Sequence, residues 1–515
     1  MKASFPLRIA AGVLAITLTI APGITAVRAA VPAPETRGSL EGIDAFITAL
    51  MSEFQVPGLA IGVIADGKVI LSKAYGKRDV ERNLPATTNT VMAVGSVTKS
   101  FTALLLAMLV EETKLAWDRP VRDYMPDFRL ADDYATANMT VRDLLTHASG
   151  LPSHDRVWKG RSFTRQQLFE RLRYLEPNTT FRQRFQYQNL MVVTAGLLAE
   201  RITGKTWDAL IRERLFIPLG MTRSSTSITE IVKADDFAQP YMPLDGKAIR
   251  EPFLNIDAVG PAGAINSSVE DMLKYVQFRL DLGAVNGRQL VPRAAAQLME
   301  TAQIAMPTPA DTDEIDFAAY GFGLAIESYK GHRMVHHSGG IDGFIAEMGW
   351  MPKQRIGLVI LTNRTANPLA QIIHRQVYDQ LLRLPPTDWA ARWRKTVEQA
   401  VARNAATRLR LDKERIRNAP PTHALAAYAG EYDHPGYGRM TVKHNAGILE
   451  IHFDKFVVRL KPYHYDVFEV NIDGEIPNLV PVRGLVKFHT GAGGRIDTLS
   501  IPFETAVPDI LFTRQ

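Results

Sequence analysis

The sequence of 515 residues contains no cysteine. Disulfide bonds, thiolate metal sites and the lipid-bearing cysteine of a bacterial lipoprotein are therefore excluded. Neither H-E-x-x-H nor G-x-S-x-G occurs, which argues against a zincin-type metalloprotease and against an α/β-hydrolase. A chain of this length buries enough apolar surface to fold without disulfides, and it is expected to form two or three domains.

A strong excess of positive charge is also missing. The formal net charge is +6, and Lys2, Arg8 and Arg28 supply three of those charges. The remainder of the chain is nearer +3, which gives no case for a nucleic-acid partner. The basic segment 392–414 also contains acidic residues, so we predict a solvated helix there.

The N-terminus lacks an apolar run long enough to span a bilayer. Lys2 and Arg8 precede the mainly apolar run 9–20, whereas a spanning helix needs about 20 residues. Pro22-Gly23 interrupt the run. We predict a signal peptide at 1–29, cleaved near Ala29, and a periplasmic or secreted protein without a stable membrane anchor. A retained anchor is the less favoured alternative.

Strand patterns lie at both ends of the region 30–384. Residues 58–75 predict a hairpin that turns at Asp66-Gly67, and strand patterns return between 322 and 361. A helix is expected at 40–54, and mainly helices and loops from 96 to 303. This order predicts an α+β domain in which the first and last segments close one antiparallel sheet.

The C-terminal part has a different pattern. Residues 385–419 are expected to form a helical linker, which Pro420-Pro421 end. From 420 to 515 short alternating strands predict a small all-β domain, most plausibly a barrel. Two roles stay open for this domain: it binds an apolar ligand, or it packs against the first domain, covers one side of a cleft or supports oligomerisation. We favour the second.

Ser96-Val97-Thr98-Lys99 opens a long apolar helical pattern. Residues three apart on a helix project from the same face. A hydroxyl and an ammonium held that close can share a proton, which activates a serine without a histidine. The positive end of the helix dipole favours negative charge that develops at Ser96. In isolation, Ser96 could equally be an ordinary helix cap and Lys99 a solvated side chain.

Tyr187-Gln188-Asn189 precedes a second apolar helical pattern. A tyrosine is a poor base at its ordinary pKa of about 10. We expect the Lys99 ammonium to lower the pKa of Tyr187, because a nearby positive charge favours the phenolate. Asn189 can both donate and accept hydrogen bonds, which suits binding of a substrate amide.

His337-Ser338-Gly339-Gly340 lies at the end of a predicted strand. Small residues there let a substrate backbone approach closely. The backbone N–H groups of Ser96 and Gly340 are expected to form an oxyanion hole. His332 and His336 lie nearby in the sequence, but positions 336 and 337 face opposite sides of a strand. No acid stands in ligand spacing near them, so we predict neither a metal site nor a cofactor.

Two other residues have structural interpretations. His147, in the segment THASG, is interpreted as a residue that fixes a loop by hydrogen bonding. Trp158 lies in the loop 153–165, and this loop either borders the pocket or lies on the surface.

Five motifs in order make this chain resemble the serine β-lactamase-related, penicillin-recognising superfamily. Its nearest branch is that of class C β-lactamases, DD-peptidases, D-aminopeptidases and related esterases. The resemblance covers about residues 40 to 382, and residues 420–515 are similar to the lipocalin-like domain often appended to this group. The motifs are GSVTK at 95–99, TVRDLLTHASGLP at 140–152, YQN at 187–189, PLGM at 218–221 and HHSGGIDGF at 336–344.

The resemblance implies catalytic roles. Ser96 attacks a carbonyl and becomes acylated, Lys99 and Tyr187 move the proton to and from Ser96 and the leaving group, and Asn189 positions the substrate. A serine followed three positions later by a lysine is also the signature of the sister class A enzymes.

His337 departs from the pattern of many relatives, which carry a lysine in a lysine-threonine-glycine motif. The resemblance still implies a catalytic role for His337 and substrate binding by Ser338 and Gly339, which complete that motif here. Because histidine is largely neutral at pH 7 unless its pKa is shifted, we expect weak binding of β-lactam carboxylates and inefficient β-lactamase activity.

The sequence thus predicts a serine hydrolase that acts through an acyl-enzyme. The expected substrate is a small peptide or amide, with D-residues or other unusual bonds such as those of linearised cyclic peptides, or an ester. The alternatives are an acyl-trapping, penicillin-binding sensor with little turnover, and a weak β-lactamase. A homo-oligomer is compatible with the sequence.

Overall fold

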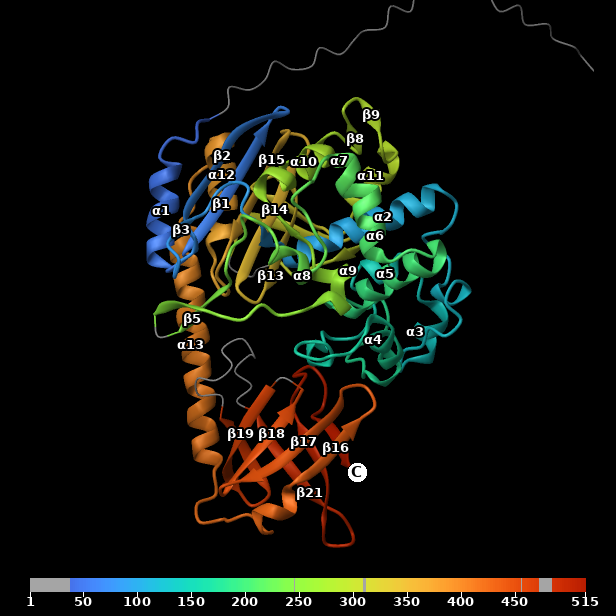
Figure 1. The fold of residues 1–515 in the computed structure, drawn as a ribbon, viewed down its shortest axis with the longest axis vertical. Helices are drawn as coiled ribbons and strands as arrows, with labels where there is room; N and C mark the ends of the chain where they lie inside the picture. The colour runs from blue at the N-terminus through green and yellow to red at the C-terminus, as the bar shows by residue number, and fades with distance from the viewer. Residues whose placement is uncertain (1–37, 245, 309–311, 455, 472–483) are drawn as a thin grey trace, which may run out of the picture.

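The structure is a computed structural model that describes residues 38–244, 246–308, 312–454, 456–471 and 484–515. An α+β domain is followed by a long helix and then by a β-barrel (Figure 1). The predicted signal peptide at 1–29 lies outside the described residues. Among the residues that are described, no helix is both long and apolar enough to cross a membrane.

One antiparallel sheet forms the centre of the first domain. β1 pairs with β15, so that the first and last segments of the domain close the sheet as the sequence predicts. β1 and β2 form the predicted hairpin. Within the described residues the sheet has nine strands, in the order β10 (Ile304–Ala305), β11 (Ile315–Tyr320), β12 (Ala325–Tyr329), β13 (His332–Ile341), β14 (Phe344–Met351), β15 (Ile356–Thr362), β1 (Gly58–Ala65), β2 (Lys68–Asp79) and β3 (Leu84–Pro85).

Helices cover both faces of this sheet. Helices α1 (Ile43–Glu53) and α12 (Leu369–Leu382) pack on one face, which we call the α12 face. The other face packs against α10 (Val269–Leu280) and the cluster around α2 (Thr98–Glu111). Strand β15 shows why both faces are apolar: Leu358 and Ile360 belong to the first cluster, whereas Val359 and Leu361 belong to the second. Side chains of a strand alternate between faces, so a doubly covered strand is apolar throughout.

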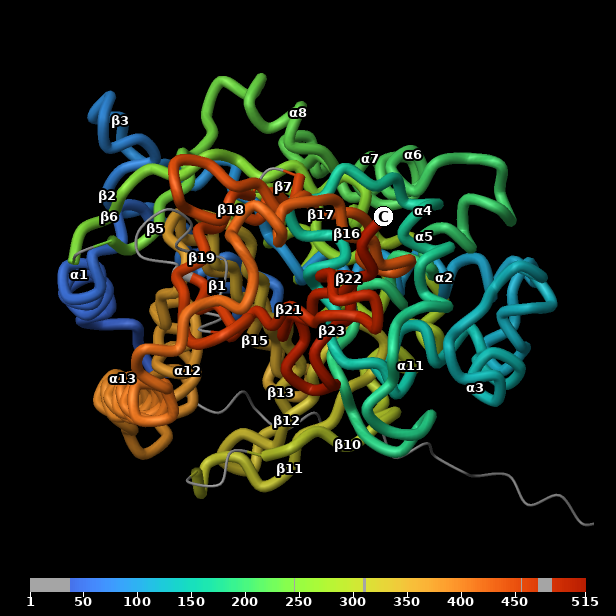
Figure 2. Tube along the Cα trace, turned by 90° about the horizontal axis from the view of Figure 1, so that it is seen from below, coloured from blue at the N-terminus to red at the C-terminus, as the bar shows by residue number. Residues whose placement is uncertain are grey.

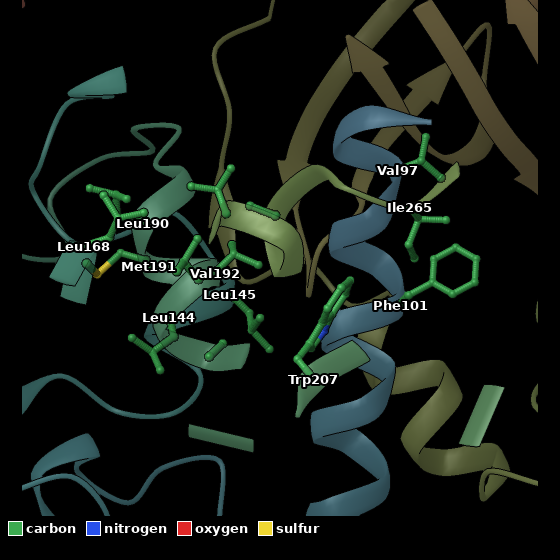
Figure 3. Packing of buried hydrophobic residues seen from close by; sticks show 14 of the residues in the cluster. Val97, Phe101, Leu144, Leu145, Leu168, Leu190, Met191, Val192, Trp207 and Ile265 are labelled. Carbon is green, nitrogen blue, oxygen red and sulfur yellow. The ribbon is translucent and has the colours of Figure 1, made fainter. Parts of the chain in front are cut away.

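Helix α2 passes through the interior (Figure 3). All its residues from Thr98 to Leu109 are buried. Phe101 stacks on Tyr275 with 3.9 Å between ring centroids, and the indole Nε1 of Trp207 donates to Thr102 Oγ1 at 3.0 Å. From Ala103 to Leu109 every residue is apolar, as expected of a helix in a core, and this burial fixes the position of the polar residues at its N-terminal end.

Apart from α5, the remaining elements between β3 and β10 are short. Three two-stranded ribbons pair β4 (Met92–Ala93) with β7 (Asn266–Ser267), β5 (Tyr241–Leu244) with β6 (Lys247–Arg250), and β8 (Ala284–Val285) with β9 (Arg288–Gln289). The helices are α3 (Asp133–Asn138), α4 (Arg165–Arg171), α5 (Asn189–Thr203), α6 (Trp207–Ile211), α7 (Ile217–Leu219), α8 (Ile228–Ile231), α9 (Gly260–Gly263) and α11 (Arg293–Met299).

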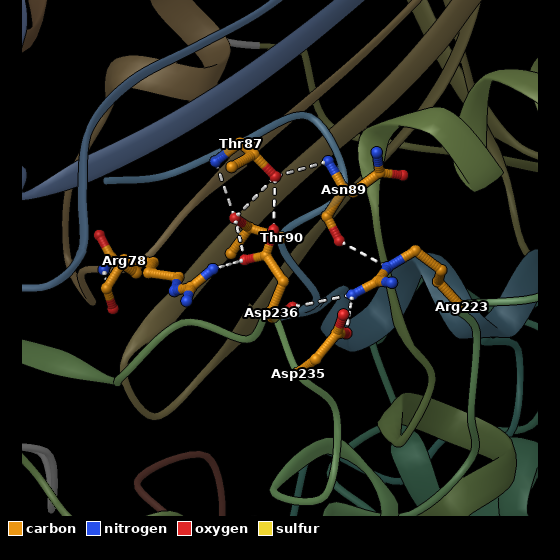
Figure 4. A network of polar contacts seen from close by, with 8 residues as sticks. Arg78, Thr87, Asn89, Thr90, Arg223, Asp235 and Asp236 are labelled. Atoms are coloured by element: carbon orange, nitrogen blue, oxygen red, sulfur yellow. Dashed lines mark hydrogen bonds and ion pairs between the residues drawn. The ribbon is translucent and has the colours of Figure 1, made fainter. Parts of the chain in front are cut away.

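A polar network joins the segment after β2 to the segment before β5 (Figure 4). Asp236 accepts hydrogen bonds from Thr87 Oγ1 at 2.5 Å and Thr90 Oγ1 at 2.6 Å, and it pairs with Arg78. Arg223 pairs with the neighbouring Asp235 at 2.7 Å. Charge-assisted hydrogen bonds of this kind are stronger than neutral ones, so they hold the chain that leads into the turn before α2.

Helix α13 (Trp389–Glu414) connects the two domains. Its first turn is capped by Asp388, which accepts a hydrogen bond from Ala391 N at 2.8 Å, as helix N-termini favour. Figures 1 and 2 place the barrel beneath the first domain, with α13 to one side. The boundaries predicted at 30–384, 385–419 and 420–515 stay predictions.

The C-terminal domain is a closed antiparallel barrel, as predicted. Tyr432 and Phe488 are examples of side chains buried in it. Asp473-Gly474, a pair whose sequence predicts a turn, lies outside the described residues. Among those described, the barrel has eight strands: β16 (Gly430–His434), β17 (Gly438–Asn445), β18 (Ile448–Phe453), β19 (Phe456–His464), β20 (Val467–Asn471), β21 (Leu485–Thr490), β22 (Ile496–Ile501) and β23 (Ile510–Arg514).

Candidate active site

Ser96 lies in the turn that leads into α2. A 3₁₀ turn covers Gly95–Val97, and the α-helix begins at Thr98, two residues later than the sequence pattern indicates. Lys99 is in the first turn of the helix and its side chain is completely buried. Its Nζ lies 3.0 Å from Ser96 Oγ, so the predicted proton-sharing pair is present.

The Lys99 amine is enclosed by groups that do not carry a full negative charge. Nζ donates to the carbonyl oxygen of Ala262 at 2.8 Å and lies 4.8 Å from the centre of the Tyr187 ring. Burial lowers the pKa of Lys99 to about 7, although the negative charge of Asp155 acts in the opposite direction. Removal from water disfavours the ammonium form, so a large share of Lys99 is a neutral amine, and therefore a base, near pH 7.

Tyr187 lies just before α5 and beside Ser96. Burial raises the pKa of Tyr187 above its ordinary value, and the neighbouring Ser96 hydroxyl opposes this only in part. The prediction that Lys99 lowers the pKa of Tyr187 is therefore wrong. The physical reason is that the same burial that disfavours the Lys99 ammonium also disfavours a phenolate. Tyr187 remains protonated and can donate.

Strand β13 runs directly beside the Ser96 turn. A Cβ on Gly339 would lie 1.9 Å from the carbonyl oxygen of Val94 and 3.1 Å from Ser96 N, so only glycine permits this approach. The strand ends at Ile341, one residue after Gly340, so the motif occupies the end of the strand as predicted. Gly340 and Ser96 line the same cavity. The oxyanion hole expected from their N–H groups stays a prediction.

His337 lies behind the pocket. Its Nδ1 donates to the carbonyl oxygen of Ser338 at 2.5 Å, and its Nε2 accepts from the Tyr320 hydroxyl at 2.8 Å. Burial, followed by the nearby Lys99 charge, lowers the pKa of His337 to about 3, so the ring is neutral. His337 contacts the back of Tyr187, with 6.3 Å between ring centroids, and it is absent from the cavity lining, as are Ser338 and Gly339.

The cavity beside Ser96 has a volume of about 330 Å³. Asn189 faces it, as predicted, and its Nδ2 donates to Asp155 Oδ1 at 2.9 Å. Trp158 also borders the cavity, and its Nε1 donates to the same Asp155 oxygen at 2.7 Å. The cavity is lined by Gly95, Ser96, Asp155, Trp158, Lys159, Tyr187, Asn189, Ile256, Val259, Ala262, Gly263, Gly340, Ile341, Asp342 and Thr365.

His147 supports the segment that carries Tyr187. Its Nδ1 accepts a hydrogen bond from the backbone N–H of Gln188 at 3.0 Å, and its ring lies 4.4 Å from the Tyr187 ring. The predicted loop-fixing hydrogen bond is therefore present, one residue away from the tyrosine.

One wall of the cavity is a loop that the barrel holds. We call residues 153–163 the pocket loop. Glu504 of the barrel domain accepts hydrogen bonds from Ser153 Oγ at 2.9 Å and from the His154 backbone N–H at 3.0 Å. The Tyr437 hydroxyl donates to His154 Nδ1 at 2.7 Å, because the other ring nitrogen donates to the Glu176 carbonyl oxygen. These contacts flank Asp155 directly.

The other end of the pocket loop is held in the same way. Arg161 pairs with Asp454 at 3.2 Å and lies 3.7 Å from the centre of the Phe453 ring. Between the two anchors, Lys159 pairs across the cavity mouth with Asp342, which follows β13, at 3.0 Å. The barrel thus supports the loop from both sides of the residues that face the cavity.

Sequence reasoning missed Asp155, Tyr320 and Glu504. Asp155 lies in a loop that the sequence marked only through Trp158, and an acid next to a family-like segment is the signal that could have identified it. Tyr320 and Glu504 reach the site from β11 and from the C-terminal domain. No local pattern identifies such residues, because the fold alone brings them there.

Comparisons with known proteins agree with this geometry. The family described as Beta-lactamase matches residues 43–382, and a domain of unknown function (DUF3471) matches residues 414–514. The unguisins hydrolase ungD of Aspergillus violaceofuscus is 30% identical over 431 residues, which are 78% of this chain and 76% of that protein.

Solved structures show the same fold. The octameric penicillin-binding protein homologue from Pyrococcus abyssi has a TM-score of 0.58 at 24% identity, and the match covers 92% of this chain and all (100%) of that chain. The D-amino acid amidase of Ochrobactrum anthropi has a TM-score of 0.55 at 23% identity, over 66% of this chain and 98% of that chain. The chain is a serine hydrolase that belongs to the beta-lactamase family.

Proposed function

We propose that the chain hydrolyses amide bonds of small peptides or amino-acid amides through an acyl-enzyme on Ser96. The observation that carries the proposal is the 3.0 Å contact between Ser96 Oγ and the Nζ of Lys99, whose pKa is lowered by burial to about 7. A base with a pKa near the working pH is the efficient choice for general base catalysis.

Acylation follows from the positions of these groups. The neutral amine of Lys99 accepts the Ser96 proton while Oγ attacks the substrate carbonyl carbon. The carbonyl oxygen takes up negative charge, which the N–H groups of Ser96 and Gly340 stabilise. The C–N bond then breaks, and the leaving nitrogen takes a proton from Tyr187, which regains one from the Lys99 ammonium. In deacylation, water takes the place of the leaving amine: it gives up a proton, attacks the acyl carbon and releases the acid, while Ser96 Oγ regains its proton.

The pocket supports a preference for substrates with a positively charged amino group. Asp155 faces the cavity beside Asn189, so an ammonium next to the scissile amide meets an acidic side chain there. His337 is held by Tyr320 and Ser338 behind Tyr187, and so it offers no fixed charge to a substrate carboxylate. This arrangement favours amides and peptides over β-lactams, with esters as a secondary class.

The names of relatives suggest the stereochemistry. One relative is a hydrolase of unguisins and another is an amidase of D-amino acids. We infer that residues of D configuration, or otherwise unusual peptides such as linearised cyclic ones, are among the substrates. The location belongs to the same proposal: residues 1–29 act as a signal peptide, and the protein works in the periplasm or outside the cell. We also propose that the chain assembles into a homo-oligomer. We propose neither a nucleic-acid partner nor a cofactor.

The test is turnover by the mature protein on four substrates: a D-alanine anilide, an L-alanine anilide, a p-nitrophenyl ester and a chromogenic cephalosporin. We expect repeated turnover of the D-alanine anilide, slower ester hydrolysis and little cephalosporin hydrolysis. Ser96→Ala should abolish all of it, whereas Ser100→Ala, one turn further along the same helix, should not.

Two results would overturn the proposal. Cephalosporin hydrolysis as fast as that of the anilides or the ester would make the protein a β-lactamase. Labelling of Ser96 by a single equivalent without turnover of any substrate would make it an acyl-trapping sensor.

A further inference from the structure

Two histidines and a glutamate converge on the α12 face of the sheet, behind β13, the strand that runs beside the Ser96 turn. His336 comes from β13, Glu347 from β14 and His374 from α12. Glu347 Oε1 lies 3.0 Å from His336 Nδ1 and 3.1 Å from His374 Nδ1. Among the described residues, these three form the only group of three or more histidine and acidic side chains whose potential ligand atoms all lie within 4.8 Å of one another.

Several polar atoms of this group have unused bonding capacity. Glu347 Oε2 and the Nε2 atoms of both histidines are buried without a hydrogen-bond partner, and so is Oε2 of the adjacent Glu327. The side chains of Glu347 and His374 are only 1% and 3% exposed, so bulk water does not satisfy them. Buried polar atoms in native proteins nearly always have a partner, and exceptions call for an ion or another explanation.

The backbone leaves room for both imidazoles. Gly349 lies opposite His336 in the register of β13 and β14. A Cβ on Gly349 would lie 2.7 Å from two atoms of the His374 ring and 2.9 Å from His336 Cβ. Any other residue at this position would displace His374 from the cluster. The convergence of the three side chains therefore depends on this glycine.

The charge of the cluster favours a cation. Both carboxylates lie beside His336: Glu347 Oε1 is 3.0 Å from its Nδ1, and Glu327 Oε1 is 3.4 Å from its Nε2. Arg375 is the nearby cation on α12, and its guanidinium group stacks over the Trp389 ring, 4.4 Å from the ring centre. Two carboxylates thus face two imidazoles in a buried place, and neutral imidazoles with carboxylates are ligands that zinc-class ions prefer.

We propose that His336, Glu347 and His374 bind one divalent ion of the zinc class, with a water as the fourth ligand. The donor separations of 3.0 and 3.1 Å are close to the edge of about 3.3 Å in a tetrahedron with metal–ligand bonds of about 2.0 Å. Glu327 Oε1 lies 3.4 Å from Nε2, the other ring nitrogen of His336, so Glu327 would orient that ring as an outer partner of the ligand. The side chains of His336 and Glu327 are 16% and 12% exposed, which gives an ion access.

The ion would have a structural role. It would connect β13 and β14 to α12, and it would not touch the pocket, because His336 and the neighbouring His337 lie on opposite faces of the strand. The Ser96→Ala variant should therefore bind the ion as well as the wild type does. The protein can lack the ion and still be a hydrolase, or bind the ion and show no hydrolase activity. The two tests therefore separate this inference from the proposed function.

The experiment begins with the intact mature protein. After growth with added zinc and gel filtration in chelator-free buffer, elemental analysis should find about one zinc per chain. Removal of the ion with a chelator should lower Tm by about 4 °C, and added zinc should restore it, as expected for a ligand at about 100 times its Kd. Less than about 0.1 ion per chain, with no response of Tm to added zinc, would overturn the proposal.

Variants locate the ion. Glu347→Gln and His374→Gln should lose both the bound zinc and the Tm response. His452→Gln is the matched control, because His452 lies beside Glu450 on the barrel, at 3.4 Å, without a second histidine in that pair. Zinc retained by both cluster variants would refute the assignment. If these variants do not fold, Co²⁺ added to the chelated wild type decides: visible absorption of four-coordinate cobalt supports the site, and its absence refutes it.

Discussion

The two walls of the pocket are built on different physical principles. On the first wall, Ser96, Lys99 and Tyr187 interact as a buried group on and beside helices of one domain. On the second wall, Asp155 and Lys159 are acidic and basic side chains on the pocket loop. The contacts of Lys99 with Ser96 and with the Ala262 carbonyl lie within the first domain, whereas Glu504, Tyr437 and Asp454 of the barrel hold the loop of the second wall in place.

This difference assigns separate tasks to the two walls. Burial sets the proton affinity of the reacting groups on the first wall, since it lowers the pKa of Lys99 and raises that of Tyr187. The second wall offers charge and shape to the substrate, and its position depends on tertiary contacts. The barrel is therefore better interpreted as a support for substrate selection than as a separate binding module.

The largest effect is expected on the first wall. Tyr187→Phe removes the hydroxyl that exchanges a proton with the leaving nitrogen, and it should lower kcat by about 100- to 10,000-fold. KM should change little, because the ring remains in place. Steady-state kinetics on the preferred anilide measure both constants. Tyr134→Phe is the control, since Tyr134 is 68% exposed, and an equal loss in both variants would contradict the role of Tyr187.

The next effect is on the pH dependence of kcat/KM, which connects Lys99 of the first wall with Asp155 of the second. Lys99 acts as the neutral amine, so kcat/KM should rise about tenfold per pH unit below a pKa of about 7 and level off above it. The Asp155 charge raises the pKa of Lys99. Asp155→Asn should therefore move this rising part of the pH profile, which we call the limb, to lower pH.

A matched variant sharpens this test. Asp342→Asn also removes an acidic residue of the cavity, one that pairs with Lys159, and it should leave the limb in place. A pH profile of kcat/KM for the three proteins gives the answer. A limb that stays fixed in Asp155→Asn, or that moves to higher pH, would contradict the assignment of Lys99 as the base.

The smallest effect is expected from the barrel. Glu504→Ala removes the acceptor of two hydrogen bonds to the pocket loop. Charge-assisted bonds contribute about 1.5 to 3 kcal/mol each when buried, and we expect about a tenfold loss in kcat/KM, mainly through KM. Glu469→Ala, which instead breaks a pair with Arg415 of the linker, should leave the kinetics unchanged. Equal kinetics for Glu504→Ala and the wild type would mean that the loop needs no support.

Local sequence patterns predicted much of the fold and of the reacting groups. The hairpin at Asp66-Gly67 and the alternation of β18 are signals carried by neighbouring residues. The motifs of the family identified Ser96, Lys99 and Tyr187 because their order along the chain is specific. These features are encoded within a few residues of one another, so a single sequence suffices to find them.

What the sequence could not predict depends on distance and burial. The direction of the Tyr187 pKa shift follows from enclosure, which no motif reports. No acidic residue stands in ligand spacing near His336 in the sequence. In the structure, Glu347 from the next strand lies beside it, and His374 from a helix contacts the same carboxylate. Glu504 is beyond local prediction for the same reason, because its partner on the pocket loop is 350 residues away.

That separation has a consequence for the time at which the enzyme becomes complete. Ser153 and Glu504 are 351 positions apart, and ribosomes add about 5 to 20 residues per second. Ser153 has therefore been synthesised about 20 to 70 s before Glu504 exists, and Ser96 and Lys99 earlier still. A growing chain holds its nucleophile well before it can fix the wall that faces the substrate, and any product that stops short of the last strands keeps that immature pocket.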